Sequence, residues 1–257
     1  YANIWLNGKL LASRDSVFGT FRRFSFDISN LLNSNGNTLA LEVFRAQPGD
    51  FNTGFVDWNP RPPDESMGIW REVYLQVSGE VSMSNTYVES DLNTATLNEA
   101  SLTVKTNLKN NSLNTINGLL KGKIENIEFS YPVQIQPGQT IDLKLTTIEI
   151  PALHLKKPRL WWCNNLGSPE LYNLNLRFES NGITTDKQKV TFGIRKIEMY
   201  TNAGGHKGFK LNGKELLIKG AGWTDDIFLR DSLSSLETQI QYVRHMNLNT
   251  IRLESIW

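Results

Sequence analysis

The chain has 257 residues, of which 39% are hydrophobic and 21% are charged, and its formal net charge at pH 7 is +1. A net charge this close to zero gives no electrostatic reason to expect nucleic acid or an anionic membrane surface as a partner. No apolar run reaches the roughly 18 residues that cross a bilayer. One cysteine and three scattered histidines exclude an internal disulfide framework, and we expect no metal and no cofactor.

The first part of the chain predicts antiparallel β-structure. Asn7 and Gly8 supply the positive φ angles of a tight hairpin turn. Segments 21–32 and 37–44 are typical of two further strands, and the alternating apolar residues of 71–79 indicate another. The segment up to residue 79 therefore predicts the second part of a jelly-roll β-sandwich. Residue 1 already lies in a strand-like run, so we expect a fragment of a longer protein, from which any export signal would be missing.

The stretch "FVDWNPRPPDESMGIWREV", residues 55–73, is a long connection with little secondary structure of its own. Such connections are usually either functional or disordered. Its prolines and aromatic residues argue against disorder, which favours few aromatic residues. We therefore expect a rigid functional loop.

Residues 81–194 predict short strands at regular spacing, each bounded by Asn, Gly, Pro or Ser. About seven strands in about 110 residues fit an immunoglobulin-like sandwich. Trp161 and Trp162 precede a turn in this segment, where core and edge packing explains them best. The strand-like segments are 84–92, 100–110, 116–124, 131–150, 170–180 and 188–195.

The pattern changes after residue 195. A hairpin about Asn212-Gly213 is followed by a buried-looking strand at 216–219. Segment 231–246 has helical periodicity, with Ser234 and Glu237 at capping-box spacing. An apolar strand then returns. A strand, a helix and a strand without polar alternation predict one unit of a parallel α/β sheet, here the start of a (β/α)8 TIM barrel.

Four segments together resemble glycoside hydrolase family 2, the retaining β-glycosidases. They are "MGIWREVYL" (67–75), "FGIRKIE" (192–198), "LNGKELLIKGAGW" (211–223) and "MNLNTIRLE" (246–254). The resemblance implies a mainly β, multidomain chain: a sugar-binding-like sandwich at 1–79, an immunoglobulin-like sandwich at 80–194 and the beginning of the catalytic barrel at 195–257. Around 57–73 and 219–230 it looks most similar to the exo-β-D-glucosaminidases, with the β-mannosidase and endo-β-mannosidase branch second.

The resemblance also implies the chemistry. A retaining glycosidase needs two carboxylates about 5 to 5.5 Å apart. In this family both are glutamates at the ends of later barrel strands, so we expect them beyond residue 257 and assign no catalytic residue here. A β-linked oligosaccharide is the expected partner, and the polymeric substrate implies a periplasmic or secreted enzyme.

Three residues after the first barrel strand are predicted at the mouth of the barrel, because such active sites form at the carboxyl ends of the strands. Trp223 would stack on a sugar ring, and Asp225 and Asp226 would accept hydrogen bonds from hydroxyl or ammonium groups. The alternative for the aspartates is stabilisation of a helix start by the helix dipole.

Four further residues complete the predicted substrate-binding set. By resemblance, Arg252 supports the nucleophile through a charge-assisted hydrogen bond. Glu254 would face a glucosamine amine, or else form a structural ion pair with Arg252. In the loop at 55–73, Asp57 would contact the non-reducing-end sugar with Trp58 beside it. The alternative is that Asp57 caps a turn and the tryptophan packs between domains.

Two other functions compete with the glycosidase. The first segment would serve as a non-catalytic carbohydrate-binding module if the chain carried no chemistry of its own. A structural spacer made of stacked sandwiches is the third possibility. The strand–helix–strand pattern near the end argues against the spacer, because such arrays do not need part of a barrel.

Overall fold

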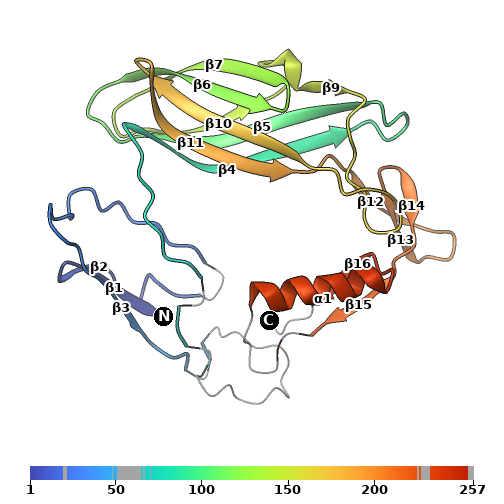
Figure 1. The fold of residues 1–257 in the computed structure, drawn as a ribbon, viewed down its shortest axis with the longest axis horizontal. Helices are drawn as coiled ribbons and strands as arrows, with labels where there is room; N and C mark the ends of the chain where they lie inside the picture. The colour runs from blue at the N-terminus through green and yellow to red at the C-terminus, as the bar shows by residue number, and fades with distance from the viewer. Residues whose placement is uncertain are drawn as a thin grey trace. The chain divides into compact units, whose positions relative to one another are not determined.

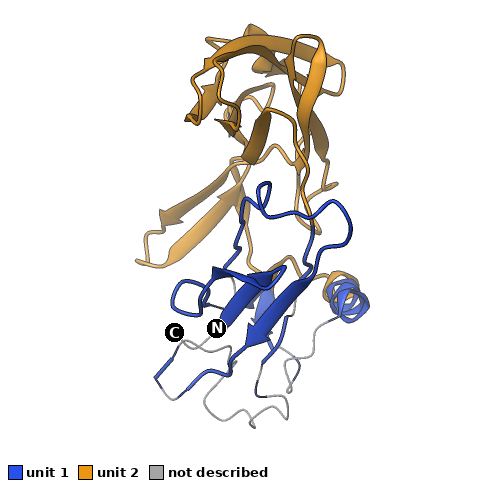
Figure 2. Cartoon of the chain, turned by 90° about the vertical axis from the view of Figure 1, so that its left-hand side faces the viewer, with its two compact units in different colours: residues 1–74, 220–242, 251–257 blue, residues 75–219, 243–250 orange. Residues whose placement is uncertain are grey.

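The computed structural model describes residues 1–19, 22–47, 49–50, 65, 67–69, 71–224, 226 and 232–253. The described chain is mainly β, arranged in several sheets with one α-helix. It divides into two compact units, 1–74 with 220–242 and 251–257, and 75–219 with 243–250 (Figure 2).

The first unit contains a three-stranded antiparallel sheet in the order β2-β1-β3, built from β1 (Ala2–Leu6), β2 (Lys9–Ala12) and β3 (Leu39–Val43). Asn7 and Gly8 form the turn between β1 and β2 with φ angles of 51° and 77°. The Asn7 side chain ties this turn to the next segment, since its Oδ1 accepts from the Thr38 backbone at 2.9 Å. The predicted hairpin and the predicted strand at 37–44 are confirmed.

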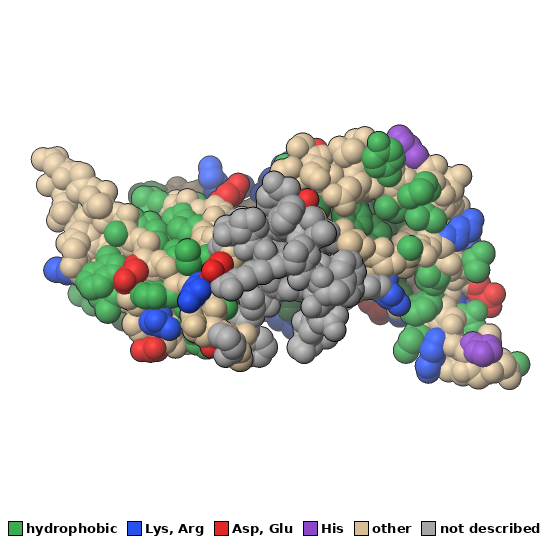
Figure 3. Space-filling model, turned by 90° about the horizontal axis from the view of Figure 1, so that it is seen from below, with side chains coloured by type: hydrophobic (Ala, Val, Ile, Leu, Met, Phe, Trp, Pro, Cys, Tyr) green, Lys and Arg blue, Asp and Glu red, His purple; other side chains and the backbone are tan. Residues whose placement is uncertain are grey.

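Two predicted strands are wrong. The described residues of 21–32 and all of 71–79 have no strand structure. The side chains of Val73, Leu75 and Val77 are 58%, 66% and 79% exposed. Figure 3 shows hydrophobic side chains on the face of the molecule that it draws. Alternating apolar residues define a face, but a strand also needs a neighbouring strand for its backbone hydrogen bonds. Among the described residues, neither segment has one.

The second unit is built around a β-sandwich of two four-stranded sheets (Figure 1). One sheet contains β4 (Val81–Leu92), β5 (Glu99–Asn110), β8 (Thr140–Leu145) and β9 (His154–Lys156), the last directly after the 3-10 turn η1 (Pro151–Leu153). The other has the order β11-β10-β6-β7, formed by β6 (Ile116–Ile124), β7 (Ile127–Ile135), β10 (Tyr172–Ser180) and β11 (Ile183–Phe192). The strand pairings in both sheets are antiparallel. The strand-rich segment was thus correctly predicted.

The main buried core lies between the two sheets, and all of its members fall within residues 81–194. Leu102, Leu108, Leu174 and Phe178 are each 0% exposed, and along β5 and β10 such buried residues alternate with more exposed ones. Burying one such side chain contributes roughly 1.5–3 kcal/mol. The alternation therefore supplies the energy that holds the sheets together.

The two sheets are also joined along one edge, between β4 and β11. The buried carboxylate of Asp186 accepts from the Met83 backbone at 2.7 Å. Thr185 Oγ1 donates to the Val81 carbonyl at 2.9 Å. These bonds satisfy backbone groups at the edge, where an unpaired buried donor would cost about 1–3 kcal/mol.

Glycines on β6 make room for two aromatic rings of the core. Gly122 lies opposite Phe129, and a Cβ on Gly122 would overlap that ring. A Cβ on Gly118 would overlap the Phe178 ring and would lie 2.6 Å from the Glu179 carbonyl oxygen. Only glycine fits where an aromatic ring and a backbone carbonyl approach this closely.

A separate three-stranded antiparallel sheet follows the sandwich, formed by β12 (Ile197–Thr201), β13 (Lys207–Leu211) and β14 (Lys214–Leu216). The predicted turn at Asn212-Gly213 is confirmed, with φ angles of 52° and 77°. The predicted strand at 216–219 is wrong. Leu216 ends β14, residues 217–219 have no strand structure, and the next strand, β15 (Gly220–Trp223), begins after them. Leu217 is 74% exposed, so apolar character alone did not indicate burial here.

The side chain of Asn212 is buried, and both its oxygen and its nitrogen form hydrogen bonds. Its Oδ1 accepts from the Lys196 backbone at 2.9 Å, and its Nδ2 donates to the Trp161 carbonyl at 3.1 Å. It is 1% exposed and has a positive φ angle. One residue thus connects the β13–β14 turn to two other segments.

We expect Asn212→Ala to lower the free energy of unfolding by about 2 kcal/mol. The substitution leaves buried backbone groups without their hydrogen-bond partners and places alanine in the left-handed region. Urea denaturation would measure the loss. Asn212→Gly keeps the backbone conformation and removes only the side-chain bonds, so it should lose about half as much. Equal losses for the two variants would contradict the conformational part of this explanation.

Helix α1 (Leu233–His245) is the predicted helix, although it begins differently. Ser232 caps it: its Oγ accepts from the Ser235 backbone at 3.2 Å. The predicted capping box at Ser234 and Glu237 is therefore wrong, since both residues lie inside the helix. The segment contains three serines within four residues, and any of them suits an N-cap on residue type alone.

Candidate functional site

The predicted site residues that the structure describes lie on one strand–helix–strand segment: β15, α1 and β16 (Thr250–Leu253). Strands β15 and β16 are neighbours in a two-stranded sheet. Trp223 is the last residue of β15 and is half-buried, while Arg252 lies exposed in β16. Two side chains that are 29 positions apart in the sequence are therefore carried by adjacent strands. One helix and two strands do not by themselves define a barrel.

The remaining predicted residues divide into two groups. Asp226 is half-buried and lies three residues beyond β15. The others fall outside the described residues: Asp57, Trp58, Asp225 and Glu254. The structure therefore brings Trp223 and Arg252 onto neighbouring strands, and the contribution of the loop at 55–73 stays a prediction.

Asn249 holds the starts of the two strands together, and sequence reasoning missed it. Its Oδ1 accepts from the Lys219 backbone at 2.9 Å, while its Nδ2 donates to the Leu217 carbonyl at 3.0 Å. Its own backbone N–H donates to the Lys219 carbonyl at 2.9 Å. The carboxamide thus acts like an additional piece of strand backbone, immediately before β15 and β16. An asparagine at the start of an apolar strand was the only available sequence signal.

Two more asparagines bond the end of α1 to the sandwich loop. Asn164 Nδ2 donates to the carbonyls of Arg244 and Leu248, both at 3.1 Å, and Asn165 Nδ2 donates to the Asn247 carbonyl at 2.6 Å. The last carbonyls of a helix have no partner within the helix. One of these amide bonds reaches the helix carbonyl of Arg244 and the other two reach the turn after α1, so together they fix the end of the helix on the loop that follows the two tryptophans.

The tryptophans themselves pack against cations and glycines. The Arg195 guanidinium lies 4.5 Å from the centre of the Trp161 ring, and Lys214 Nζ lies 5.0 Å from that of Trp162. Trp162 also packs against the core cluster. The packing role predicted for this pair is therefore confirmed. The neighbouring Cys163 is buried, and burial raises the pKa of its thiol, which keeps it protonated at neutral pH.

Among the described residues, no group of three or more His, Cys, Asp or Glu side chains is arranged to hold a metal ion. Within the same residues, no helix is long and apolar enough to cross a membrane.

Comparison with known proteins shows which protein family the chain resembles. Residues 81–195 match the family model described as glycosyl hydrolases family 2. This segment is therefore similar to proteins of that family.

Several relatives of this chain are exo-β-D-glucosaminidases. The chain is 34% identical over 254 residues to the exo-β-D-glucosaminidase of Amycolatopsis orientalis, covering 98% of this chain and 24% of that protein. The crystal structure of the A. orientalis exo-chitosanase CsxA matches with a TM-score of 0.90 at 32% identity, over 98% of this chain and 29% of that one. A mannosylglycoprotein endo-β-mannosidase of Lilium longiflorum is 31% identical over 98% of the chain and 29% of its own length.

The resemblance stated from the motifs is thus confirmed. The chain spans about a quarter of the length of these relatives, from 24% to 29%.

Proposed function

We propose that this chain is part of a retaining, exo-acting β-glycoside hydrolase that removes β-linked glucosamine from chitosan-type oligosaccharides. One observation carries the proposal: the 34% identity to an exo-β-D-glucosaminidase extends over 98% of the chain. Solved complexes of the A. orientalis exo-chitosanase contain PNP-β-D-glucosamine, which is the substrate chemistry that we infer for this protein. The catalytic glutamates belong to a part of the protein outside these 257 residues.

The proposed parts are a sugar-binding-like sandwich at 1–79, an immunoglobulin-like sandwich at 80–194 and the beginning of a (β/α)8 barrel at 195–257. The strand–helix–strand segment supports the third part, because β15 and β16 are adjacent strands joined through a helix. In a barrel of this type the carboxyl ends of the strands form the active site. Trp223 and Arg252 would then lie at the sugar pocket, together with Asp225, Asp226 and Glu254.

The roles follow from side-chain chemistry. The Trp223 ring offers an apolar face for the C–H face of a sugar. The Arg252 guanidinium would donate to the nucleophilic carboxylate and keep it ionised, as an adjacent positive charge lowers a carboxyl pKa. Asp57 and Trp58 would approach the non-reducing-end sugar. The prolines between residues 60 and 63 would restrict that loop and so reduce the entropy lost on binding.

The test is a direct assay of glycoside hydrolysis. We expect the protein encoded by the complete reading frame to release p-nitrophenol from p-nitrophenyl β-D-glucosaminide, and the 257-residue chain alone to release none. Activity of the short chain would contradict the assignment of the catalytic glutamates to another part of the protein. If the complete protein cleaves only the p-nitrophenyl β-mannoside, the proposed substrate changes from β-linked glucosamine to the β-mannoside of the mannosidase branch.

The mannosidase is the second candidate because the endo-β-mannosidase of L. longiflorum matches over the same share of the chain. A non-catalytic carbohydrate-binding module is the third. Sugar binding by residues 1–80 alone, with no hydrolysis by the complete protein, would favour that module.

A further inference from the structure

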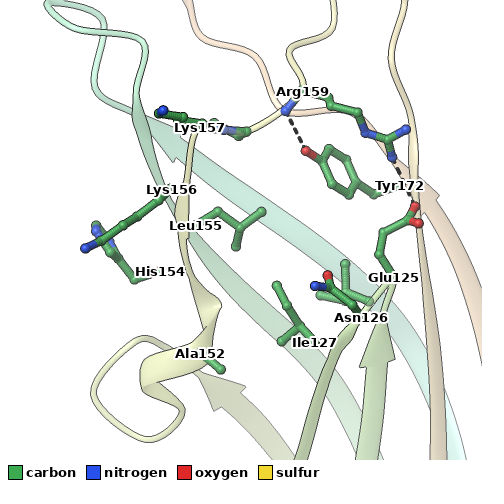
Figure 4. Close-up of a pocket in the computed structure, with 12 residues that line it drawn as sticks. Glu125, Asn126, Ile127, Ala152, His154, Leu155, Lys156, Lys157, Arg159 and Tyr172 are labelled. Carbon is green, nitrogen blue, oxygen red and sulfur yellow. Dashed lines mark hydrogen bonds and ion pairs between the residues drawn. The ribbon is translucent and has the colours of Figure 1, made fainter.

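An open pocket of about 480 Å³ lies at one end of the sandwich (Figure 4). It is formed between the β6–β7 turn, strand β9 with the residues after it, and the first residue of β10. Pockets of roughly 300–1,000 Å³ are the size that holds small ligands. The whole pocket belongs to the second compact unit. Its lining residues include Glu125, Asn126, Ile127, Leu155, Arg159 and Tyr172.

The pocket has an apolar floor and a polar rim. The side chains of Leu155 and Ile127 lie in the middle of the pocket, with Asn126 beside Ile127, and Glu125 and Arg159 lie along the rim on the side away from Lys156 and Lys157 (Figure 4). The Arg159 guanidinium lies 3.1 Å from the Glu125 carboxylate and 4.8 Å from the centre of the Tyr172 ring. A planar carboxylate, a carboxamide and a guanidinium therefore stand beside an aliphatic surface.

The turn that supplies two of these groups is unusual for this protein. The described chain has four hairpins with two-residue loops, and three of them use Asn-Gly: Asn7-Gly8, Asn181-Gly182 and Asn212-Gly213. The fourth, between β6 and β7, uses Glu125-Asn126. Asn-Gly suits the three other turns because both of their residues have positive φ angles, whereas in the β6–β7 turn only the first residue has one.

Glu125 is held in the left-handed region with a φ angle of 52°. A non-glycine residue other than Asn or Asp seldom adopts this conformation, and its occurrence costs stability. The ion pair with Arg159 is a weak reason to keep glutamate there, because both side chains are about half exposed. Lys157, on the opposite side of the pocket, has a φ angle of 49°. Two strained positions thus line one pocket, as is common where a fold binds a ligand.

We propose that this pocket binds a neutral saccharide, with the C–H face of the sugar on Leu155 and Ile127 and its hydroxyl groups bonded to Glu125, Asn126 and Arg159. A pyranose presents one apolar face and a polar edge, which matches the floor and the rim of the pocket. Lys156, Lys157 and Arg159 outnumber the carboxylates of Glu125, which lines the pocket, and Glu170, which pairs with Arg159 at 3.5 Å. This excess of positive charge disfavours a protonated amino sugar, so the ligand differs in charge from the free glucosamine unit of the proposed substrate.

The experiment uses the 257-residue chain and needs no catalysis, so it can succeed or fail independently of the proposed function. Saturation-transfer NMR would test N,N′-diacetylchitobiose and cellobiose as neutral probes and glucosamine as the cationic probe. We expect saturable binding of at least one neutral probe in the millimolar range and at least tenfold weaker binding of glucosamine. Absence of neutral-sugar binding, or equal binding of glucosamine, would overturn the proposal.

A hairpin exchange provides the variants. Replacing Glu125-Asn126 by Asn-Gly, as Glu125→Asn with Asn126→Gly, should raise the melting temperature by a few degrees because the turn strain is relieved. The same variant should lose at least tenfold in sugar affinity. The matched control makes the reverse exchange in the β10–β11 turn, Asn181→Glu with Gly182→Asn. It should lower the melting temperature and leave sugar binding unchanged.

The two readouts of the exchange move in opposite directions, and this separates a binding role from a purely structural one. If the Asn-Gly turn lowers the melting temperature, Glu125-Asn126 serves the fold and the proposal is overturned. It is equally overturned if the stabilised variant binds sugar as the unmodified chain does.

Discussion

Gly118→Ala should lower the free energy of unfolding by about 3 kcal/mol, the largest stability loss that we expect from adding a single carbon atom. The new Cβ would overlap the buried Phe178 ring and lie 2.6 Å from the Glu179 carbonyl oxygen. A side chain can shift to relieve overpacking, but this carbonyl belongs to a paired strand in the middle of the sheet. Urea denaturation of the 257-residue chain would measure the loss.

A second substitution separates overpacking from the general effect of replacing glycine. Gly138 has open space around it and a φ angle of 67°, which asparagine tolerates, so Gly138→Asn should be almost neutral. Combining Gly118→Ala with Phe178→Leu should cost less than the sum of the two single losses, since the smaller side chain vacates part of the space. Additive losses would show that the contact with Phe178 is not the cause.

Arg252→Ala in the complete enzyme should lower kcat/KM by about a hundredfold, or roughly 2.7 kcal/mol of transition-state stabilisation. The expectation rests on the proposed function, in which the guanidinium donates to the nucleophilic carboxylate. The loss should fall mainly on kcat, because the bond supports a charged group that reacts. Steady-state kinetics with p-nitrophenyl β-D-glucosaminide would measure both constants.

Two further variants distinguish a role in the reaction from a structural one. Arg252→Lys keeps the charge but not the planar pair of donors, so its kcat/KM should lie between those of the unmodified enzyme and Arg252→Ala. Arg177→Ala removes an exposed arginine from sandwich strand β10 and should leave kcat unchanged. A loss confined to thermal stability, with kcat intact in Arg252→Ala, would remove this arginine from the proposed site.

Much of the sandwich could be predicted because two kinds of information agree there. Along β5 and β10, alternating burial follows alternating apolar residues, and Asn-Gly or similar turns end the strands. The segments at 22–32 and 71–79 carry the same alternation without the same outcome. The difference lies in the neighbours: whether a strand has a hydrogen-bonding partner is a tertiary property that local pattern does not contain.

The candidate site was predictable to a similar extent. The order strand, helix, strand was enough to expect Arg252 on a strand beside the one that precedes the helix, since strands joined through a helix usually lie in one sheet. Trp223 was expected after a strand at 216–219, whereas it is the last residue of β15. The supporting asparagines were not predictable. Asn164, Asn165 and Asn249 act through bonds to backbone carbonyls and amides that are remote in sequence or belong to another element. An exposed asparagine has no pattern that separates this role from an ordinary turn.

The pairing of the sandwich strands has a consequence for the order in which the protein folds. Three pairs, β4–β5, β6–β7 and β10–β11, join strands that follow each other directly along the chain. The β6–β10 pair, in contrast, closes a long loop. Local contacts form at little entropic cost, whereas pairing across long loops is slow. The hairpins should therefore form early in folding. The pairing of β6 with β10 should then limit the rate at which water is excluded from the hydrophobic core.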